Sequence, residues 1–195
     1  MNASSIQLVS PSSTPRTRRA VLAALLLVSL ILAGSALAAG KLVKNGSFEK
    51  DGNGDGIPNN WNPGSLTPAD KRVCNQSYAA SCSFKMVADG TVKVLKQLII
   101  VSGVAGEEFI LSAWTKGKDL VLGGGAARIY LVFNHTDGSN NAWYFDIPAG
   151  TSAWTLSQVS GQADENYDYI TISLQFIEPS SGKVWADKVK LVAVP

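Results

Sequence analysis

Three oxygen-bearing side chains in the first third of the chain have the spacing of a calcium-binding loop. Asp51, Asn53 and Asp55 occupy positions 1, 3 and 5 of such a loop, and Gly56 stands where it turns sharply. Position 12 is Asn62 instead of the bidentate glutamate that completes the pattern. The same residue types also favour a plain polar turn, because they tolerate unusual backbone angles. The sequence leaves both interpretations open.

Groups suited to catalysis are scarce. The one histidine, His135, lies in a predicted turn, Phe-Asn-His-Thr-Asp-Gly at 133–138, where we expect it to be solvated. The sequence contains no Gly-x-Ser-x-Gly, no His-Glu-x-x-His and no phosphate-binding glycine-rich loop. A pair of carboxylates for glycoside cleavage is left open, because its recognition depends on their separation in space. We therefore predict that the protein is not an enzyme.

The two cysteines, Cys74 and Cys82, lie eight positions apart and flank a short polar segment. This spacing suits a hairpin closed by a disulfide in an oxidising compartment. A metal site is the poorer interpretation, since two cysteines and one distant histidine do not supply a ligand set. We predict a disulfide.

The first 38 residues have the three parts of a secretory signal. Three arginines at positions 16, 18 and 19 precede an apolar run over 20–32, and Ala36-Leu37-Ala38 ends it with small residues. We predict a signal helix over 1–38, cleavage after Ala38, one domain over 39–195, and a secreted, extracellular protein. The alternative is an N-terminal membrane anchor, since roughly 20 apolar residues can span a bilayer.

Charge gives no support to a polyanionic partner. Loss of the three signal-segment arginines lowers Lys plus Arg from 17 to 14, while Asp plus Glu stays at 15, so residues 39–195 carry about −1. We therefore expect no nucleic acid as a partner and, after signal cleavage, no membrane.

Short alternating or β-branched runs separated by Gly, Pro, Asn and Asp predict an all-β domain. We expect strands over 42–48, 71–75, 82–88, 94–102, 108–116, 127–133, 142–147, 154–160, 169–177 and 184–194. This density of strands predicts a two-sheet antiparallel sandwich or a barrel.

Strand alternation assigns side chains to two faces. Ten residues are expected in the core: Phe109, Leu111, Ala113, Ile129, Leu131, Phe133, Ile170, Ile172, Leu174 and Phe176. Nine are expected to face away from it: Ser112, Trp114, Lys116, Arg128, Tyr130, Asn134, Thr171, Ser173 and Gln175. Aromatic, cationic and amide groups are thus predicted outside the core.

Four segments resemble carbohydrate-binding modules of the cellulose- and xylan-binding jelly-roll type, which belong to the galactose-binding-domain-like superfamily. Residues 42–49, Leu-Val-Lys-Asn-Gly-Ser-Phe-Glu, resemble their first strand, and 54–61, Gly-Asp-Gly-Ile-Pro-Asn-Asn-Trp, the loop to their first core tryptophan. Residues 106–116 resemble their Tyr-x-Leu-Ser-x-aromatic-x-Lys strand, and 181–191 their final strand. The resemblance spans nearly all of 41–194.

The resemblance implies a jelly-roll β-sandwich that holds a structural Ca²⁺ ion. It places Glu49, at the end of the first strand, and Asp187, in the last, together as ligands. Backbone carbonyls nearby would supply the remaining oxygens. The alternative for both carboxylates is hydrogen bonding at strand ends.

The resemblance also implies a carbohydrate ligand, a poly- or oligosaccharide. Sugar rings stack on aromatic side chains, and flanking polar groups bond their hydroxyls. We predict one accessible surface formed by Trp114, Tyr130, Arg128, Gln175 and Ser173, with Asn134 and Lys116 at its edge. The alternative is that its aromatic residues are core residues. Three tryptophans, Trp61, Trp154 and Trp185, are assigned to the core or its margin, while Trp143 and Tyr144 could point either way.

A second class of function stays open. The domain could be an extracellular structural or adhesive jelly roll that binds protein rather than glycan. Exposed aromatic rings among polar neighbours would favour glycan, whereas a flat apolar patch would favour protein. In either case we expect a monomer.

Overall fold

The structure is a computed structural model that describes residues 42–179 and 181–195, which contain ten strands and no helix. The predicted signal segment, 1–38, and its cleavage position lie outside the described residues. Nothing within the described ranges has the helical length and apolar character that a membrane span requires.

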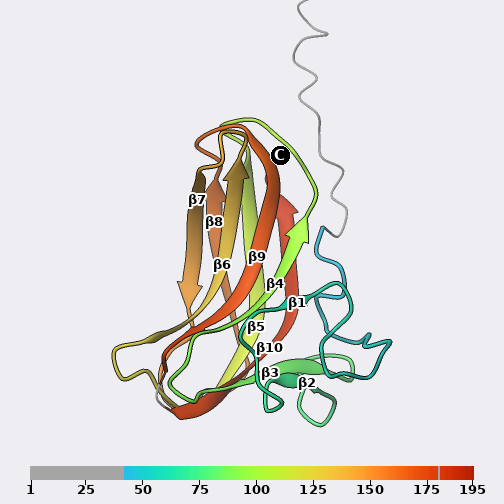
Figure 1. Cartoon of the computed structure of the whole chain (residues 1–195), viewed down its shortest axis with the longest axis vertical. Coiled ribbons are helices and arrows are strands. Elements are labelled where there is room, and N and C mark those ends of the chain that lie inside the picture. The colour runs from blue at the N-terminus through green and yellow to red at the C-terminus, as the bar shows by residue number, and fades with distance from the viewer. Residues whose placement is uncertain (1–41, 180) are drawn as a thin grey trace, which may run out of the picture. The chain divides into compact units, whose positions relative to one another are not determined.

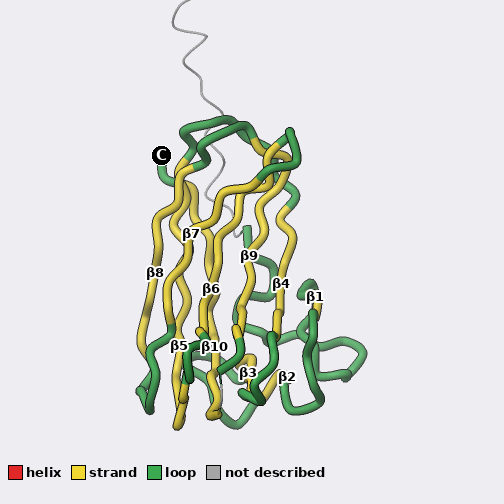
Figure 2. Tube along the Cα trace, turned by 60° about the vertical axis from the view of Figure 1, so that its left-hand side comes forward, coloured by secondary structure: helices red, strands yellow, loops and turns green. Residues whose placement is uncertain are grey.

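The strands form two antiparallel five-stranded sheets that pack face to face (Figure 1). Sheet A has the order β1-β4-β9-β6-β7, with bounds Asn62–Pro63, Lys93–Ile99, Tyr167–Ile177, Ala126–His135 and Asn140–Asp146. Sheet B has the order β2-β3-β10-β5-β8, with bounds Lys71–Val73, Ser83–Val87, Ser181–Ala193, Glu108–Val121 and Thr155–Gln162. The long strands run side by side and the loops gather at their ends (Figure 2). The predicted two-sheet antiparallel sandwich is confirmed.

The core lies between the sheets and is built from alternate residues of each strand. All ten residues that alternation assigned to the core are buried there. Phe48, Trp61 and Phe84 also belong to it, with the Phe48 ring centroid 5.1 Å from that of Trp61 and 5.9 Å from that of Phe84. Burying each such side chain contributes about 1.5–3 kcal/mol. The core is therefore the part of the fold that the sequence predicted best.

The first predicted strand, 42–48, is wrong. The segment is a run of turns, with left-handed backbone at Asn45 (φ 51°) and Phe48 (φ 57°). The Gln97 side chain takes the place of a strand partner: its amide group donates to the Lys44 carbonyl and accepts from the Lys44 amide, both at 2.8 Å. A Cβ at Gly46 would lie 2.1 Å from the Val189 carbonyl oxygen. This close contact with β10 requires glycine.

A charged network is buried where an alternating strand should place an apolar residue. Lys93 faces inward and is fully buried, with its Nζ 2.9 Å from Asp70 Oδ2 and 2.8 Å from Asp89 Oδ2. The Val87 carbonyl accepts a further hydrogen bond from it at 2.7 Å. Burial alone lowers the pKa of Lys93, but its bonds with Asp89 and Asp70 outweigh this, so the pKa is raised. Lys93 is a cation in the folded protein because these groups surround it.

Replacing Lys93 by methionine should lower the free energy of unfolding by about 3–5 kcal/mol, because the buried Asp70 would lose its cation. Chemical denaturation measures this change. The matched variant Lys96→Met, on the exposed side of the same strand, should change stability by less than about 0.5 kcal/mol. Equal effects of the two substitutions would contradict the conclusion that Lys93 is the cation that neutralises the buried Asp70.

Candidate functional site

The outer face of sheet A gathers aromatic, charged and amide side chains in two adjacent rows across its strands. Strand register places Tyr144, Tyr130, Ser173 and Lys96 in one row. It places Asp146, Arg128, Gln175 and Val94 in the next. We call these two rows the sheet A face.

Arg128 organises the aromatic part of the sheet A face. Its Nε donates to Asp146 Oδ1 at 2.7 Å, and one of its terminal nitrogens donates to the Tyr130 hydroxyl at 3.3 Å. Its guanidinium carbon lies 4.3 Å from the centroid of the Tyr144 ring. The bonds to Asp146 and then Tyr130 raise the pKa of Arg128. Four side chains from two strands are thereby held in one arrangement.

The two tyrosines of this face offer apolar ring surface beside polar groups. Their centroids are 5.2 Å apart and their planes are tilted by 46°. Tyr144 is 44% exposed. Such a pair can contact the apolar C–H face of a sugar ring while its hydroxyls and the neighbouring charges bond the sugar's oxygens.

Two of the predicted binding residues form the polar half of this face, in unequal roles. Ser173 is 3% exposed and accepts a hydrogen bond from Gln175 Nε2 at 2.8 Å. Ser173 therefore orients Gln175 instead of offering surface to a ligand. Further along the sheet, the Asn134 amide donates to Thr171 Oγ1 at 3.1 Å.

The expectation that Trp114 shares this surface is wrong. Trp114 belongs to β5 in sheet B, whereas Tyr130 and Gln175 belong to sheet A. Alternation correctly turned Trp114 away from the core. Alternation could not show that Trp114 and the other predicted residues lie on opposite sides of the core. Lys116, expected at the edge of the same surface, lies on the outer face of sheet B with it.

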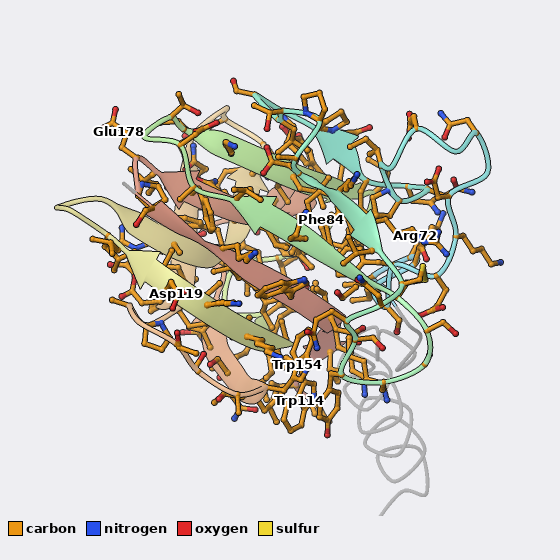
Figure 3. All side chains as sticks on the ribbon, turned by 90° about the horizontal axis from the view of Figure 1, so that it is seen from below. Arg72, Phe84, Trp114, Asp119, Trp154 and Glu178 are labelled. Atoms are coloured by element: carbon orange, nitrogen blue, oxygen red, sulfur yellow. A yellow bond between two sulfur atoms is a disulfide. The ribbon has the colours of Figure 1, made fainter. Side chains whose placement is uncertain are left out.

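Trp114 is instead part of an aromatic cluster on the outer face of sheet B. Its ring stacks with that of Tyr78 at a centroid distance of 3.6 Å and an angle of 10°. Trp154 packs edge-on against Tyr78 at 6.2 Å. Figure 3 shows Trp114 and Trp154 near each other, in agreement with their shared contact with Tyr78. Trp154 was expected in the core or at its margin. It is instead part of this outer cluster.

The remaining tryptophans divide between core and surface. Trp61 is buried in the core as expected. Trp185 is also buried, but its partners in register are Lys85 and Lys116 on the outer face of sheet B. Trp143 lies at the open edge of the sandwich, where its Nε1 donates to the Gln162 carbonyl at 3.2 Å.

The disulfide-closed loop between β2 and β3 carries Tyr78 onto Trp114. Cys74 and Cys82 are bonded as predicted, directly beyond the strand pair Val73 and Ser83. Asp187 Oδ2 accepts the amides of Tyr78 and Ala79, both at 3.0 Å. Glu49 Oε1 accepts the amides of Ser81 and Cys82 at 3.2 and 2.9 Å. The two carboxylates predicted as calcium ligands thus fix this loop.

Asp187 and Glu49 are close enough to repel each other. Burial raises the pKa of Asp187 and the Glu49 carboxylate adds to the increase, while backbone amides from Ala79, Lys188 and Tyr78 oppose it. A cation between the two carboxylates would offset this cost, although both already accept backbone amides. The carbonyls of Phe48 and Glu49 also accept hydrogen bonds of 2.7 Å from Arg72. The other oxygens around an ion would have to come from elsewhere.

The Asp51–Asn53–Asp55 segment has the geometry of a polar turn. Asp51 accepts the amides of Gly54 and Gly56 at 2.9 and 3.0 Å. Asp55 accepts the Ile57 amide at 2.7 Å and the Asn53 side chain at 2.8 Å. These oxygens point to the loop's own donors, as expected of the turn interpretation.

His135 is buried, so the prediction of a solvated histidine is wrong. Its Nδ1 lies 2.8 Å from Ser139 Oγ, and its Nε2 lies 3.0 Å from both Asn141 Oδ1 and Asp164 Oδ1. Potential ligand atoms of His135, Asp137 and Glu165 all lie within 4.8 Å of one another. It is the one such three-residue group in the described residues, and it joins two loops that are distant in the sequence.

Sequence reasoning left Tyr144 undecided and missed Asp146 and Lys96. A usable signal was present, because Phe145 and Ile147 are the apolar alternate residues of their segment. If these two face the core, Tyr144 and Asp146 must face outward. Lys96 alternates in the same way with Leu95 and Gln97.

Comparison with known proteins supports the fold. No protein-family model matches the sequence, and no curated protein matches it. Among solved structures, the enzymatically active domain of bacteriophage CBA120 tailspike protein 4 is similar with a TM-score of 0.59 and 17% identity over 79% of this chain. The match spans only 21% of that tailspike chain.

Two matches span almost the whole of their own chains. A family 61 carbohydrate-binding module, solved with β-1,4-galactotriose, has a TM-score of 0.56 at 16% identity, covering 80% of this chain and 99% of its own. A family 16 carbohydrate-binding module has a TM-score of 0.57 at 21% identity, covering 77% and 99%. The chain therefore has the jelly-roll sandwich fold of carbohydrate-binding modules.

Replacing both cysteines by serine should lower the free energy of unfolding by about 2–3 kcal/mol, because the short loop would no longer be closed in the unfolded chain. Denaturant unfolding measures this change. Tryptophan fluorescence should change as well, since Tyr78 would no longer be held on Trp114. A reductant should reproduce both effects in the parent protein and neither in the variant. An unchanged stability would show that the hydrogen bonds to Asp187 and Glu49 fix the loop without the disulfide.

Proposed function

We propose that this protein binds a poly- or oligosaccharide through the sheet A face and has no catalytic activity of its own. The observation that carries the proposal is the Arg128-centred group, in which two tyrosines, a carboxylate and a guanidinium occupy neighbouring positions. Aromatic surface framed by fixed polar groups matches the two chemical properties of a sugar. The similar module solved with galactotriose supports the choice of ligand class.

The mixed character of the sheet A face argues against the alternative of an adhesive domain that binds protein. Protein-binding patches expose contiguous apolar area. Here the exposed ring of Tyr144 lies beside Asp146 and Arg128, and Lys96 stands at the far end of the same row, so apolar area is interrupted by charge. This alternation suits a ligand that is itself polar around its edge and apolar on its faces.

We also propose that this protein acts outside the cell. The Cys74–Cys82 disulfide supports an oxidising compartment. The proposal keeps residues 1–38 as a cleaved secretion signal and 39–195 as the binding domain, which acts as a monomer.

Tyr144→Ala should weaken glycan binding by about tenfold or more, because it removes the most exposed ring of the sheet A face. A glycan array followed by calorimetry on the best ligand measures this loss. Tyr78→Ala is the matched control, since Tyr78 is 40% exposed, against 44% for Tyr144, but lies over sheet B. The control should bind as the parent does. Loss of binding in the control and its retention in Tyr144→Ala would place the glycan on the other sheet.

The proposal also includes a structural calcium ion between Glu49 and Asp187. Its support is the buried Asp187 carboxylate, whose pKa is raised by burial and by the nearby Glu49 charge. An ion there would neutralise this pair and join the N-terminal segment to β10. It would stabilise the folded state because the unfolded chain lacks the site.

Calcium at 100 times its dissociation constant should stabilise the protein by about 2.7 kcal/mol relative to chelator. Thermal unfolding measures this difference. Glu49→Gln should abolish the calcium effect, whereas Asp55→Asn should retain it because Asp55 bonds within its own turn. The reverse pattern would move the ion to the Asp51–Asp55 loop, and no calcium effect in the parent would remove the ion from the proposal.

A further inference from the structure

The outer face of sheet B carries five lysines that are dispersed in the sequence. Register places Lys71, Lys85 and Lys116 in one row across the sheet, with Trp185 between the last two. The next row contains Lys183 and Lys118. Neighbouring strands are about 4.8 Å apart, and the two rows, which lie two residues apart along each strand, are separated by about 7 Å. The two rows therefore form one basic patch, which we call the lysine face.

Trp185 holds the centre of the lysine face. The Nζ atoms of Lys116 and Lys183 each lie 5.8 Å from the centroid of its ring. Attraction between a cation and the aromatic ring fixes both side chains and offsets part of their mutual repulsion. The tryptophan is only 7% exposed, as expected where long lysine side chains lie over a ring. The two ammonium groups are thereby positioned before any ligand binds.

In the described residues, the lysines of this face form no ion pairs with acidic side chains. The ion pairs of these residues involve Lys93, Arg128 and His135 as the basic partners. Burial lowers the pKa of Lys85, and the charges of Lys71 and Lys183 lower it further, while the Asp70 carboxylate opposes part of the decrease. Crowded like charges of this kind are relieved when an anion binds.

We propose that the lysine face is a second binding site, for an acidic polysaccharide that carries carboxylate groups along its chain. The site lies on the opposite sheet from the proposed glycan site and does not share residues with it. The choice of a carbohydrate as the polyanion rests on the proposed function, whereas the preference for negative charge rests on the lysines alone. A linear polymer can cross both rows and contact several lysines at once.

The composition of the face favours this ligand over nucleic acid or a membrane. Single-stranded nucleic acids are bound by basic groups together with exposed aromatic rings on which the bases stack. Trp185, the aromatic side chain of these rows, is buried and offers no such surface. The two rows also lack an exposed large apolar side chain that could enter a lipid surface, since Trp185 is buried. Separate point charges fit carboxylates spaced along a sugar polymer.

Binding of polygalacturonate oligomers to the protein, measured by calorimetry at 50 and 300 mM salt, tests the proposal. Lys116→Gln/Lys183→Gln should bind about tenfold more weakly, and raising the salt should weaken the parent more than this variant. Lys44→Gln/Lys50→Gln removes the same number of charges elsewhere and should bind as the parent does. If the first variant unfolds at a lower temperature, Lys71→Gln/Lys118→Gln, at the exposed ends of the rows, replaces it.

Each outcome decides the proposal. Equal loss in the two double variants would reduce the effect to net charge and overturn it. Binding to phosphatidylserine vesicles or single-stranded DNA without binding to polygalacturonate would overturn the choice of ligand. The best neutral oligomer from the glycan array is titrated in parallel. Absence of binding by the neutral oligomer would then contradict the sheet A proposal, and absence of binding by the acidic oligomer would contradict the lysine face.

Discussion

The alternation of side chains along each strand is the constraint on which the rest of this structure depends. Once one set of residues is committed to the core, the other set must lie on an outer face. The core set here is continuous from Phe109 through Leu131 to Leu174. The outer sets are therefore fixed too, and both proposed binding surfaces consist of them. Function in this fold is placed by the same packing that stabilises it.

The two outer faces have different chemistry because they belong to different sheets. Sheet A presents the Arg128-centred aromatic and polar group. Sheet B presents lysines around Trp185 and, further along, an aromatic cluster beneath the disulfide loop. Strands with alternating side chains thus give one small domain two unlike surfaces, separated by its core. Such a domain could hold two kinds of sugar polymer at once.

Polar groups stabilise the places where regular pairing ends. Gln97 bonds the backbone of the irregular N-terminal segment, and Lys93 joins Asp70 and Asp89 at the margin of the core. Asp187 and Glu49 bind four amides of the disulfide loop. Buried polar groups need such partners, since an unpaired one costs about 1–3 kcal/mol. These networks explain how a loop-rich end can remain ordered beside the sheets.

The sequence by itself determined the strands from β2 to β10, the inward residues of β5, β6 and β9, and the disulfide, because each depends on local pattern or short spacing. It failed for 42–48, where an alternating pattern is overridden by the Gly46 contact with β10 and by the Gln97 side chain. Only the tertiary structure decided which strands share a sheet. That choice separated Trp114 from Tyr130 and collected five lysines from four strands in a domain of net charge near −1. Sheet membership depends on pairing between residues far apart in the chain, and periodicity within a strand carries no information about its neighbours.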